Sequence, residues 1–112
     1  IIISTPQEIS LQDVKRGIRM FDKLKVKILG LIDNMSHFIG DDGKKYAIFG
    51  EGGVKKTAEE FNKEFLGEIP LNPNVGMAGD AGKPIVEENS NHAITKIYIN
   101  FAKKIKSLYN IN

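Results

Sequence analysis

The chain has 112 residues and a formal net charge of +2, from 16 basic and 14 acidic side chains. A charge this small gives no basis for a nucleic acid or an anionic membrane as partner, and no apolar run approaches the roughly 20 residues that span a bilayer. Because the chain has no cysteine, it has no disulfide, thiolate metal site or cysteine nucleophile of its own. The cytoplasm is the expected compartment.

The apolar pattern predicts three β-strands. Ile1–Ser4 is a short β-branched run that Thr5-Pro6 closes with a turn. The segment KVKILGLID, Lys25–Asp33, is predicted to be the central strand, because it is apolar on both faces, as parallel strands covered by helices are. The third strand is FLGEIP, Phe65–Pro70, which the proline ends.

Apolar residues that recur every three or four positions predict three helices. Ser10 and Asp13 resemble a capping box at the start of the first helix. The segment MAGDAGKPIVEENSN, Met77–Asn91, is predicted to be a loop, and the final helix to run from about Asn91 to Tyr109. The three apolar stripes are Leu11, Val14, Ile18, Phe21 and Leu24; Val54, Ala58 and Phe61; and Ala93, Ile94, Ile97, Phe101, Ile105 and Leu108.

The order strand, helix, strand, helix, strand, helix predicts an α/β fold, with a parallel sheet and flanking helices in a single domain. In such sheets, ligands bind beyond the carboxyl ends of the strands. These ends fall at Thr5–Gln7, Asn34–Ser36 and Pro70–Asn72, where polar residues and prolines also gather. The sequence therefore predicts a ligand site at this edge of the sheet.

Asn34 has two interpretations. Its carboxamide offers one acceptor and two donors, which match the N6 amine and N7 of adenine. The alternative is an Asx turn, in which the side chain closes the end of the strand locally. One asparagine by itself favours the turn, and the residues alone leave both interpretations open.

Other motifs carry no assigned chemistry. GEGGVKKT, Gly50–Thr57, ends in Lys-Thr but lacks the second glycine of a phosphate loop, because Lys55 stands at that position. It is interpreted as a glycine turn into a helix, whose N-terminus could face an anion. GDAGKP, Gly79–Pro84, is interpreted as a solvated loop. His37 and His92 are isolated, so no metal site is predicted, and no catalytic residue is assigned.

The chain begins IIISTPQ, without an initiator methionine and inside a predicted strand. We interpret it as the C-terminal part of a longer protein, because a terminus inside a core strand leaves that strand frayed. The alternative is a processed product whose first strand lies at the edge of the sheet.

Five segments resemble, in order and spacing, the C-terminal half of the Mrp/ApbC-type proteins, ATP-binding iron–sulfur cluster carriers of the MinD/ParA branch of P-loop NTPases. The segments are STPQEISLQDVKRGIRMF, GLIDNMSHF, IFGEGG, FLGEIPLNPNV and DAGKPIV, and they cover nearly the whole chain from Ile1 to Val86. The terminal helix matches the family only in kind. The resemblance implies a three-layer fold, a parallel sheet between helices, of which residues 1–112 are the C-terminal portion of one domain.

The resemblance also implies a nucleotide site that is split along the domain. The phosphate loop and the residues that hold Mg²⁺ lie in the family's N-terminal half, which this chain lacks. The C-terminal half supplies the base pocket, and the family's adenine-contacting asparagine corresponds to Asn34. Pro70 and Leu71 correspond to the place where the family's chain passes the base. Thr5–Gln7 follows the strand that comes after the second switch segment of the family's nucleotide site. ATP with Mg²⁺ is the implied cofactor of the whole protein, and this chain alone is expected neither to hydrolyse ATP nor to bind it tightly.

One departure from the family concerns the loop after Asn34. Many members carry a Cys-x-x-Cys pair there, which bridges an iron–sulfur cluster between the subunits of a dimer. Here Gly40-Asp41-Asp42-Gly43 occupies those positions, and aspartate oxygens are poor substitutes for thiolates on iron–sulfur clusters. The chain is expected not to hold a cluster in the family's usual way. Its loop is predicted to be a tight Asp-Gly hairpin within Phe38–Phe49.

The first functional hypothesis is that the chain is the C-terminal part of a cytoplasmic, homodimeric ATPase. This ATPase would act in the assembly of iron–sulfur clusters or in their transfer to apo-proteins, and the hairpin would lie on its dimer or cargo surface. The second is a MinD/ParA-like regulatory ATPase that acts through a partner or a membrane. The basic end INFAKKIKSLYNIN, Ile99–Asn112, suits a membrane-surface helix, but its continuous apolar stripe favours packing on the sheet. The third is a non-catalytic adaptor that keeps the fold.

Overall fold

The computed structural model describes residues 1–109, so the last three residues of the basic end lie outside the described part. The chain forms two compact units, Ile1–Leu71 and the part from Asn72 onward. The first contains the strands β1 (Ile2–Ser4), β2 (Leu31–Asn34), β3 (Phe38–Ile39), β4 (Lys45–Tyr46) and β5 (Phe65–Ile69), and the helices α1 (Glu8–Lys23) and α2 (Gly53–Glu60). The second contains α3 (Pro73–Asp80), α4 (Ile85–Glu88) and α5 (Ala93–Tyr109).

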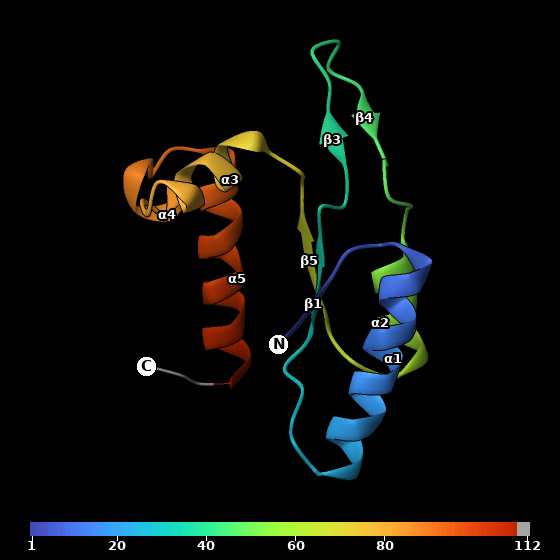
Figure 1. The fold of residues 1–112 in the computed structure, drawn as a ribbon. Helices are drawn as coiled ribbons and strands as arrows, with labels where there is room; N and C mark the ends of the chain where they lie inside the picture. The colour runs from blue at the N-terminus through green and yellow to red at the C-terminus, as the bar shows by residue number, and fades with distance from the viewer. Residues whose placement is uncertain (110–112) are drawn as a thin grey trace. The chain divides into compact units, whose positions relative to one another are not determined.

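The strands β1, β2 and β5 form a parallel sheet in that order. Strands and helices alternate along this part of the chain (Figure 1), which confirms the predicted α/β class. The strand register shifts between Leu31 and Ile32, opposite Gly67 of β5, which has a φ of 145°. Glycine adopts this φ without strain, and an irregularity of this kind bends a strand and increases its twist. The glycine therefore lets β5 remain paired with β2 up to the end of both strands.

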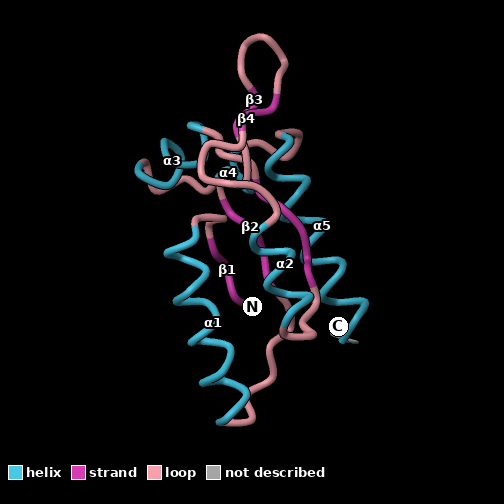
Figure 2. Tube along the Cα trace, turned by 90° about the vertical axis from the view of Figure 1, so that its right-hand side faces the viewer, coloured by secondary structure: helices cyan, strands magenta, loops and turns pink. Residues whose placement is uncertain are grey.

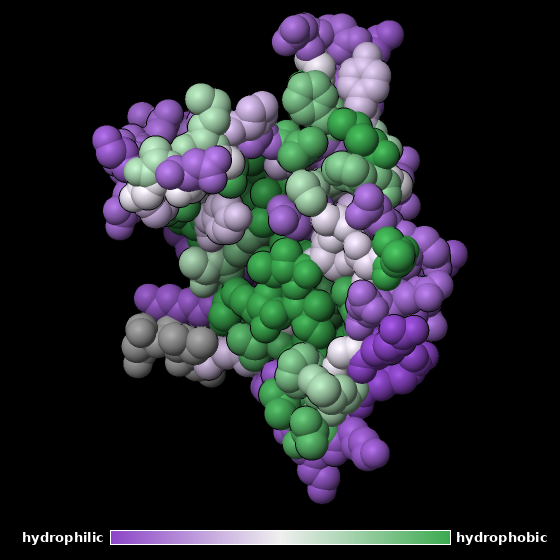
Figure 3. Space-filling model, in the orientation of Figure 1, coloured by the Kyte–Doolittle hydropathy of each residue, from purple (hydrophilic) through white to green (hydrophobic). Residues whose placement is uncertain are grey.

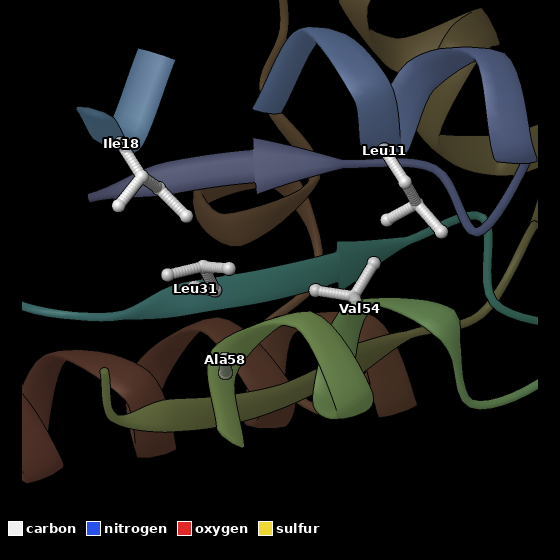
Figure 4. Close-up of a cluster of buried hydrophobic side chains, with 5 residues drawn as sticks. All are labelled: Leu11, Ile18, Leu31, Val54 and Ala58. Atoms are coloured by element: carbon white, nitrogen blue, oxygen red, sulfur yellow. The ribbon is translucent and has the colours of Figure 1, made fainter. Parts of the chain in front are cut away.

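Helices α1 and α2 pack on one face of this sheet and against each other (Figure 2). Leu11 and Ile18 of α1 and Val54 and Ala58 of α2 surround Leu31 of β2, and all five side chains are buried (Figure 4). Burying a large aliphatic side chain contributes roughly 1.5–3 kcal/mol. This cluster therefore holds the two helices on the sheet, and it confirms the buried part of the first two predicted stripes. Leu24, the last residue of the first predicted stripe, is the C-cap of α1 and is 64% exposed, so the prediction is wrong there.

The predicted central strand is shorter in the structure. Residues 25–30 are not strand, and β2 begins at Leu31. The reason lies at the end of α1, where Leu24 N–H donates to Met20 O and Lys25 has a φ of 60°. A left-handed residue directly after a helix turns the chain sharply. The apolar stretch before Leu31 returns the chain to the sheet without pairing along its full length.

The predicted capping box is wrong. Helix α1 begins at Glu8, and its N-cap residue Gln7 makes no side-chain hydrogen bond to the helix. Ser10 lies inside the first turn, where its Oγ is 2.9 Å from Thr5 Oγ1. Ser10 therefore joins the helix to the exit of β1 and does not cap it.

The second unit departs most from the sequence prediction. Met77–Asn91 is not one long loop, because the end of α3 and all of α4 lie within it. Asn72 is the N-cap of α3, its side chain accepts a hydrogen bond from Asn74 N–H at 2.9 Å, and Pro73 is the first helical residue. An asparagine followed by proline begins helices as well as turns, which is why the loop prediction fails.

Polar contacts hold the start of α5, the predicted final helix. His92 Nδ1 accepts a hydrogen bond from Ile94 N–H at 3.1 Å, as an N-cap side chain does. Thr95 is buried, and its hydroxyl lies 2.7 Å from Asn89 O and 3.1 Å from Ile85 O. These contacts join α4 to α5 and give His92 a structural role.

Helix α5 buries Ile94 and Phe101 and half-buries Ile97 and Ile105, which confirms the middle of the predicted apolar stripe. Ala93 and Leu108, at the two ends of that stripe, are exposed, so the prediction is wrong for them. Lys96, Lys103 and Lys106 are exposed, in agreement with the predicted solvated face. Within residues 1–109, none of the helices combines the length and the apolarity that a bilayer crossing requires.

Apolar side chains are also exposed along β1, which lies at the edge of the sheet among the described strands (Figure 3). Ile1 and Ile3 keep 52% and 57% of their surface exposed. An apolar sheet edge of this kind is prone to pair with another strand.

Candidate functional site

The carboxyl ends of the parallel strands lie side by side, as predicted. Ser4 of β1 pairs with Asp33 of β2, and Asn34 pairs with Ile69 of β5. The residues that follow these strands therefore begin at one edge of the sheet. This pairing brings Asn34 next to the exit of β5.

The side chain of Asn34 is half-buried and makes no hydrogen bond to another described residue. The Asx-turn interpretation is wrong. Such a turn would use Ser36 N–H, which instead donates to Ile69 O at 3.1 Å. Met35 has a φ of 53°, a left-handed conformation that is uncommon for a residue other than glycine, and it turns the chain out of β2. The amide of Asn34 is therefore available to a ligand.

Pro70 and Leu71 are half-buried where the chain leaves β5. Leu71 N–H donates to His37 O at 2.7 Å, so the exits of β2 and β5 stay hydrogen-bonded beyond the sheet. The edge thus combines one unpaired amide with two neighbouring apolar residues. Small-molecule sites are commonly built from apolar walls with a few polar groups that fix orientation.

Asp33 is buried directly before this amide. Its side chain is 2% exposed, and Oδ1 has no hydrogen-bond partner among the described residues. Burial, which disfavours the charged form, and the neighbouring Glu68 raise the pKa of Asp33 from 3.8 to about 6, while Lys45 acts in the opposite direction. The site therefore contains a carboxyl group whose pKa lies above the usual range of an aspartate.

A charged cluster connects the sheet to the hairpin. Glu68 Oε2 lies 3.7 Å from His37 Nδ1 and 3.8 Å from Lys45 Nζ. Burial and the charge of Lys45 lower the pKa of His37, and Glu68 opposes them. In the part of the chain that the structure describes, no group of three His, Asp or Glu side chains could hold a metal ion. The cluster is therefore an ion-pair network between β5 and β4.

Strands β3 and β4 form the predicted hairpin, which projects from the carboxyl edge of the sheet (Figure 1). Ile39 pairs with Lys45, and Gly40 N–H donates to Lys44 O at 2.9 Å. Gly43 has a φ of 77° in the turn, as a short hairpin loop with a left-handed glycine requires. The predicted Asp-Gly hairpin is confirmed.

The tip of the hairpin is hydrophilic (Figure 3). Asp42 accepts hydrogen bonds from the Tyr46 hydroxyl and Lys44 N–H, and these bonds lower the pKa of its carboxyl. The carboxylate therefore closes the turn in which it lies.

The glycines before α2 allow a close approach to the exit of β1. A Cβ at Gly53 would lie 2.5 Å from Leu11 Cδ1 and 3.2 Å from Pro6 O, and a Cβ at Gly50 would lie 3.1 Å from Pro6 O. Gly52 is the N-cap of α2 with a φ of 74°. The segment is confirmed as a glycine turn that leads into a helix.

Sequence reasoning placed Asp33 and Ser36 at or beside this edge but assigned no role to either side chain. A charged residue at the end of an apolar strand run was the available signal for Asp33, because such side chains are rarely buried without a partner. Ser36 gave no comparable signal, since its partner Ile69 O is distant in the sequence.

A family model described as NUBPL iron-transfer P-loop NTPase, of the ParA group, matches residues 1–106. The iron–sulfur cluster carrier protein of Saccharolobus solfataricus is 40% identical over 113 residues, which are 100% of this chain and 38% of that protein. The iron–sulfur cluster transfer protein NUBPL of Dictyostelium discoideum is 40% identical over 114 residues, 100% of this chain and 35% of that protein. The chain thus spans little more than a third of the length of these relatives.

The similar solved structures include the following two. A nucleotide-binding protein from Archaeoglobus fulgidus, in complex with ADP, has a TM-score of 0.61 and 32% identity over 72% of this chain and 35% of that chain. The MinD cell division protein of Aquifex aeolicus has a TM-score of 0.69 over 95% of this chain and 42% of that chain. At 19% identity, the second likeness shows the fold alone.

Proposed function

Because this chain belongs to the ParA/NUBPL family of iron-transfer P-loop NTPases, we propose that it supplies the adenine-binding end of a nucleotide site in an iron–sulfur cluster carrier. The observation that carries the proposal is the unpaired, half-buried amide of Asn34 at the carboxyl end of β2. The ADP complex of the similar Archaeoglobus fulgidus protein supports a nucleotide as the ligand.

The chemistry of the edge fits adenine. The amide oxygen of Asn34 accepts from the N6 amine, while its NH₂ donates to N7, the pairing by which asparagine recognises adenine in other settings. Pro70 and Leu71 provide apolar contacts for the face of the base. Guanine presents an oxygen acceptor in place of the amine, so its pairing with the same amide is poorer.

We assign the phosphates and Mg²⁺ to no residue of this chain. The sequence contains no G-x-x-x-x-G-K-[ST] segment, and the described residues form no metal-ligand group. Mg²⁺, when bound, would neutralise phosphate charge. Binding of MgATP and its hydrolysis in a cytoplasmic homodimer are proposed for the whole protein, to which residues 1–112 contribute the base-binding end.

The hairpin is proposed as a dimer or cargo surface that lacks cluster ligands of its own. With Asp42 engaged in the turn and no cysteine in the chain, a cluster would need thiolates from outside residues 1–112. Transfer of clusters to apo-proteins is supported by the two carrier relatives at 40% identity. The regulatory alternative has weaker support, since MinD is 19% identical.

The experiment is a base-selectivity titration of the intact protein. With Mg²⁺ present, ATP should bind roughly tenfold to a hundredfold more tightly than GTP, the range that corresponds to 1–3 kcal/mol for a well-made amide–base contact. Calorimetric titration gives both dissociation constants. Equal affinities for the two nucleotides would contradict adenine recognition at this edge.

A further inference from the structure

Two backbone hydrogen bonds tie the exit of β2 to the exit of β5. Ser36 N–H donates to Ile69 O at 3.1 Å, and Leu71 N–H donates to His37 O at 2.7 Å. The first is accepted by the last residue of β5 and the second lies beyond the strand, so the two bonds stand on either side of Pro70. They therefore fix where Pro70 and Leu71 stand relative to Asn34, which lies two residues before Ser36.

The side chain of Ser36 adds to this connection. It is 6% exposed, and its Oγ lies 2.8 Å from His37 Nδ1 and 3.3 Å from Ile69 O. A serine hydroxyl carries one proton. Both contacts are made together only when Nδ1 holds a hydrogen that Ser36 accepts, which leaves the hydroxyl proton for Ile69 O. One buried hydroxyl thus links the turn after Asn34 to the last residue of β5.

The groups around His37 are compatible with this link. Glu68 of β5 lies 3.7 Å from Nδ1, and Lys45 of β4 lies 3.8 Å from Glu68. Asp33 pairs with Glu68 in the neighbouring strand. The carboxylate of Glu68 favours a hydrogen on Nδ1, the arrangement in which Ser36 can donate to Ile69 O.

We propose that Ser36 is a positioning residue for the nucleotide base: its hydroxyl holds the Pro70–Leu71 segment in register with the amide of Asn34. The proposal rests on the proposed function of that amide. Ser36 itself is buried, and the proposal gives it no direct contact with the base. It acts through Ile69 O and His37. Loss of its hydroxyl loosens the Pro70–Leu71 side of the base site and leaves the phosphate contacts unchanged.

The test separates the base from the phosphates. In the intact protein, Ser36→Ala should weaken ATP binding roughly tenfold, as loss of a buried hydrogen bond predicts, and should leave the affinity for Mg²⁺–tripolyphosphate unchanged. Ser36→Thr, which keeps the hydroxyl, should restore most of the ATP affinity. Both constants are measured by displacement of a fluorescent ATP analogue.

Thr57→Val is the matched control, because it also removes a well-packed hydroxyl, which donates to Gly53 O at 2.8 Å inside α2. It should lower the melting temperature and leave ATP affinity unchanged. If Ser36→Ala does not fold, Ser36→Thr is tested instead. The ratio of the ATP affinity of Ser36→Thr to its tripolyphosphate affinity should equal the wild-type ratio.

Each other outcome overturns the proposal. The positioning role alone would be removed if Ser36→Ala kept wild-type ATP affinity, or if it lost affinity for ATP and for tripolyphosphate equally. It would also be removed if Thr57→Val or Ser36→Thr lost affinity for ATP but not for tripolyphosphate. Failure of the proposed function has a different signature: wild-type protein without preference for ATP, or an Asn34→Ala variant with unchanged ATP affinity, would overturn both.

Discussion

Replacing Asp33 with asparagine should stabilise the protein by about 1–3 kcal/mol at pH 7 to 8. The carboxyl is 2% exposed, with an unpartnered Oδ1, so ionising it inside the fold is unfavourable. A rise of its pKa from 3.8 to about 6 on folding corresponds to roughly 3 kcal/mol. Asparagine removes the charge and keeps the shape, but its own buried amide offsets part of the gain.

The sign of the pH dependence follows from the raised pKa. The folded protein holds the proton more tightly than the unfolded chain, so the extra stability is present below pH 3.8 and is lost as the pH rises to about 6. The advantage of Asp33→Asn should therefore be small near pH 4 and complete above pH 7. Urea unfolding at several pH values measures it.

Asp41→Asn provides the matched control, because Asp41 is exposed at the hairpin tip. It should leave the pH dependence of stability as in the wild type. If Asp33→Asn kept the wild-type loss of stability between pH 4 and 6, a group other than Asp33 would be responsible.

Asn34→Ala should weaken ATP binding roughly tenfold to a hundredfold. The side chain is half-buried and makes no hydrogen bond to a described residue, so its removal should change the free energy of unfolding by less than about 0.5 kcal/mol. A large loss of affinity at constant stability is the signature of a ligand contact. Titration with ATP and urea unfolding of the same preparation give both quantities.

Asn100→Ala, at an exposed position of α5, controls for a nonspecific effect of losing an amide. It should retain wild-type ATP affinity. Unchanged affinity in Asn34→Ala would show that the amide does not contact the base, and a loss of stability above 1 kcal/mol would show a structural role instead.

The sheet and its order were predictable from the sequence because strong local patterns encode them. The β-branched run before Thr5-Pro6 and the apolar stripe that contains Leu11 and Ile18 have one consistent interpretation each. The helix α3 was not predictable in this way, since Asn72-Pro73 is compatible with a turn and with a helix start. Packing, which the local sequence does not contain, decides between them.

The candidate site, like the fold, was predictable from the sequence only in part. The place of Asn34 beside Pro70 follows from the rule that parallel strands end at one edge, and the family resemblance singles out the asparagine. The burial of Asp33 and the contact of Ser36 with Ile69 depend on how β2 and β5 align. That alignment includes an irregularity at Gly67, which no periodic pattern reveals.

The central claim, that adenine binds at this edge, is tested most directly by photolabelling the intact protein with an ATP analogue that carries an azide on the adenine ring. Mass spectrometry of the digested protein locates the label. We expect it on the peptides that contain Asn34 or Pro70 and Leu71, and unlabelled ATP should suppress it. Suppressible labelling confined to other parts of the protein would contradict the account.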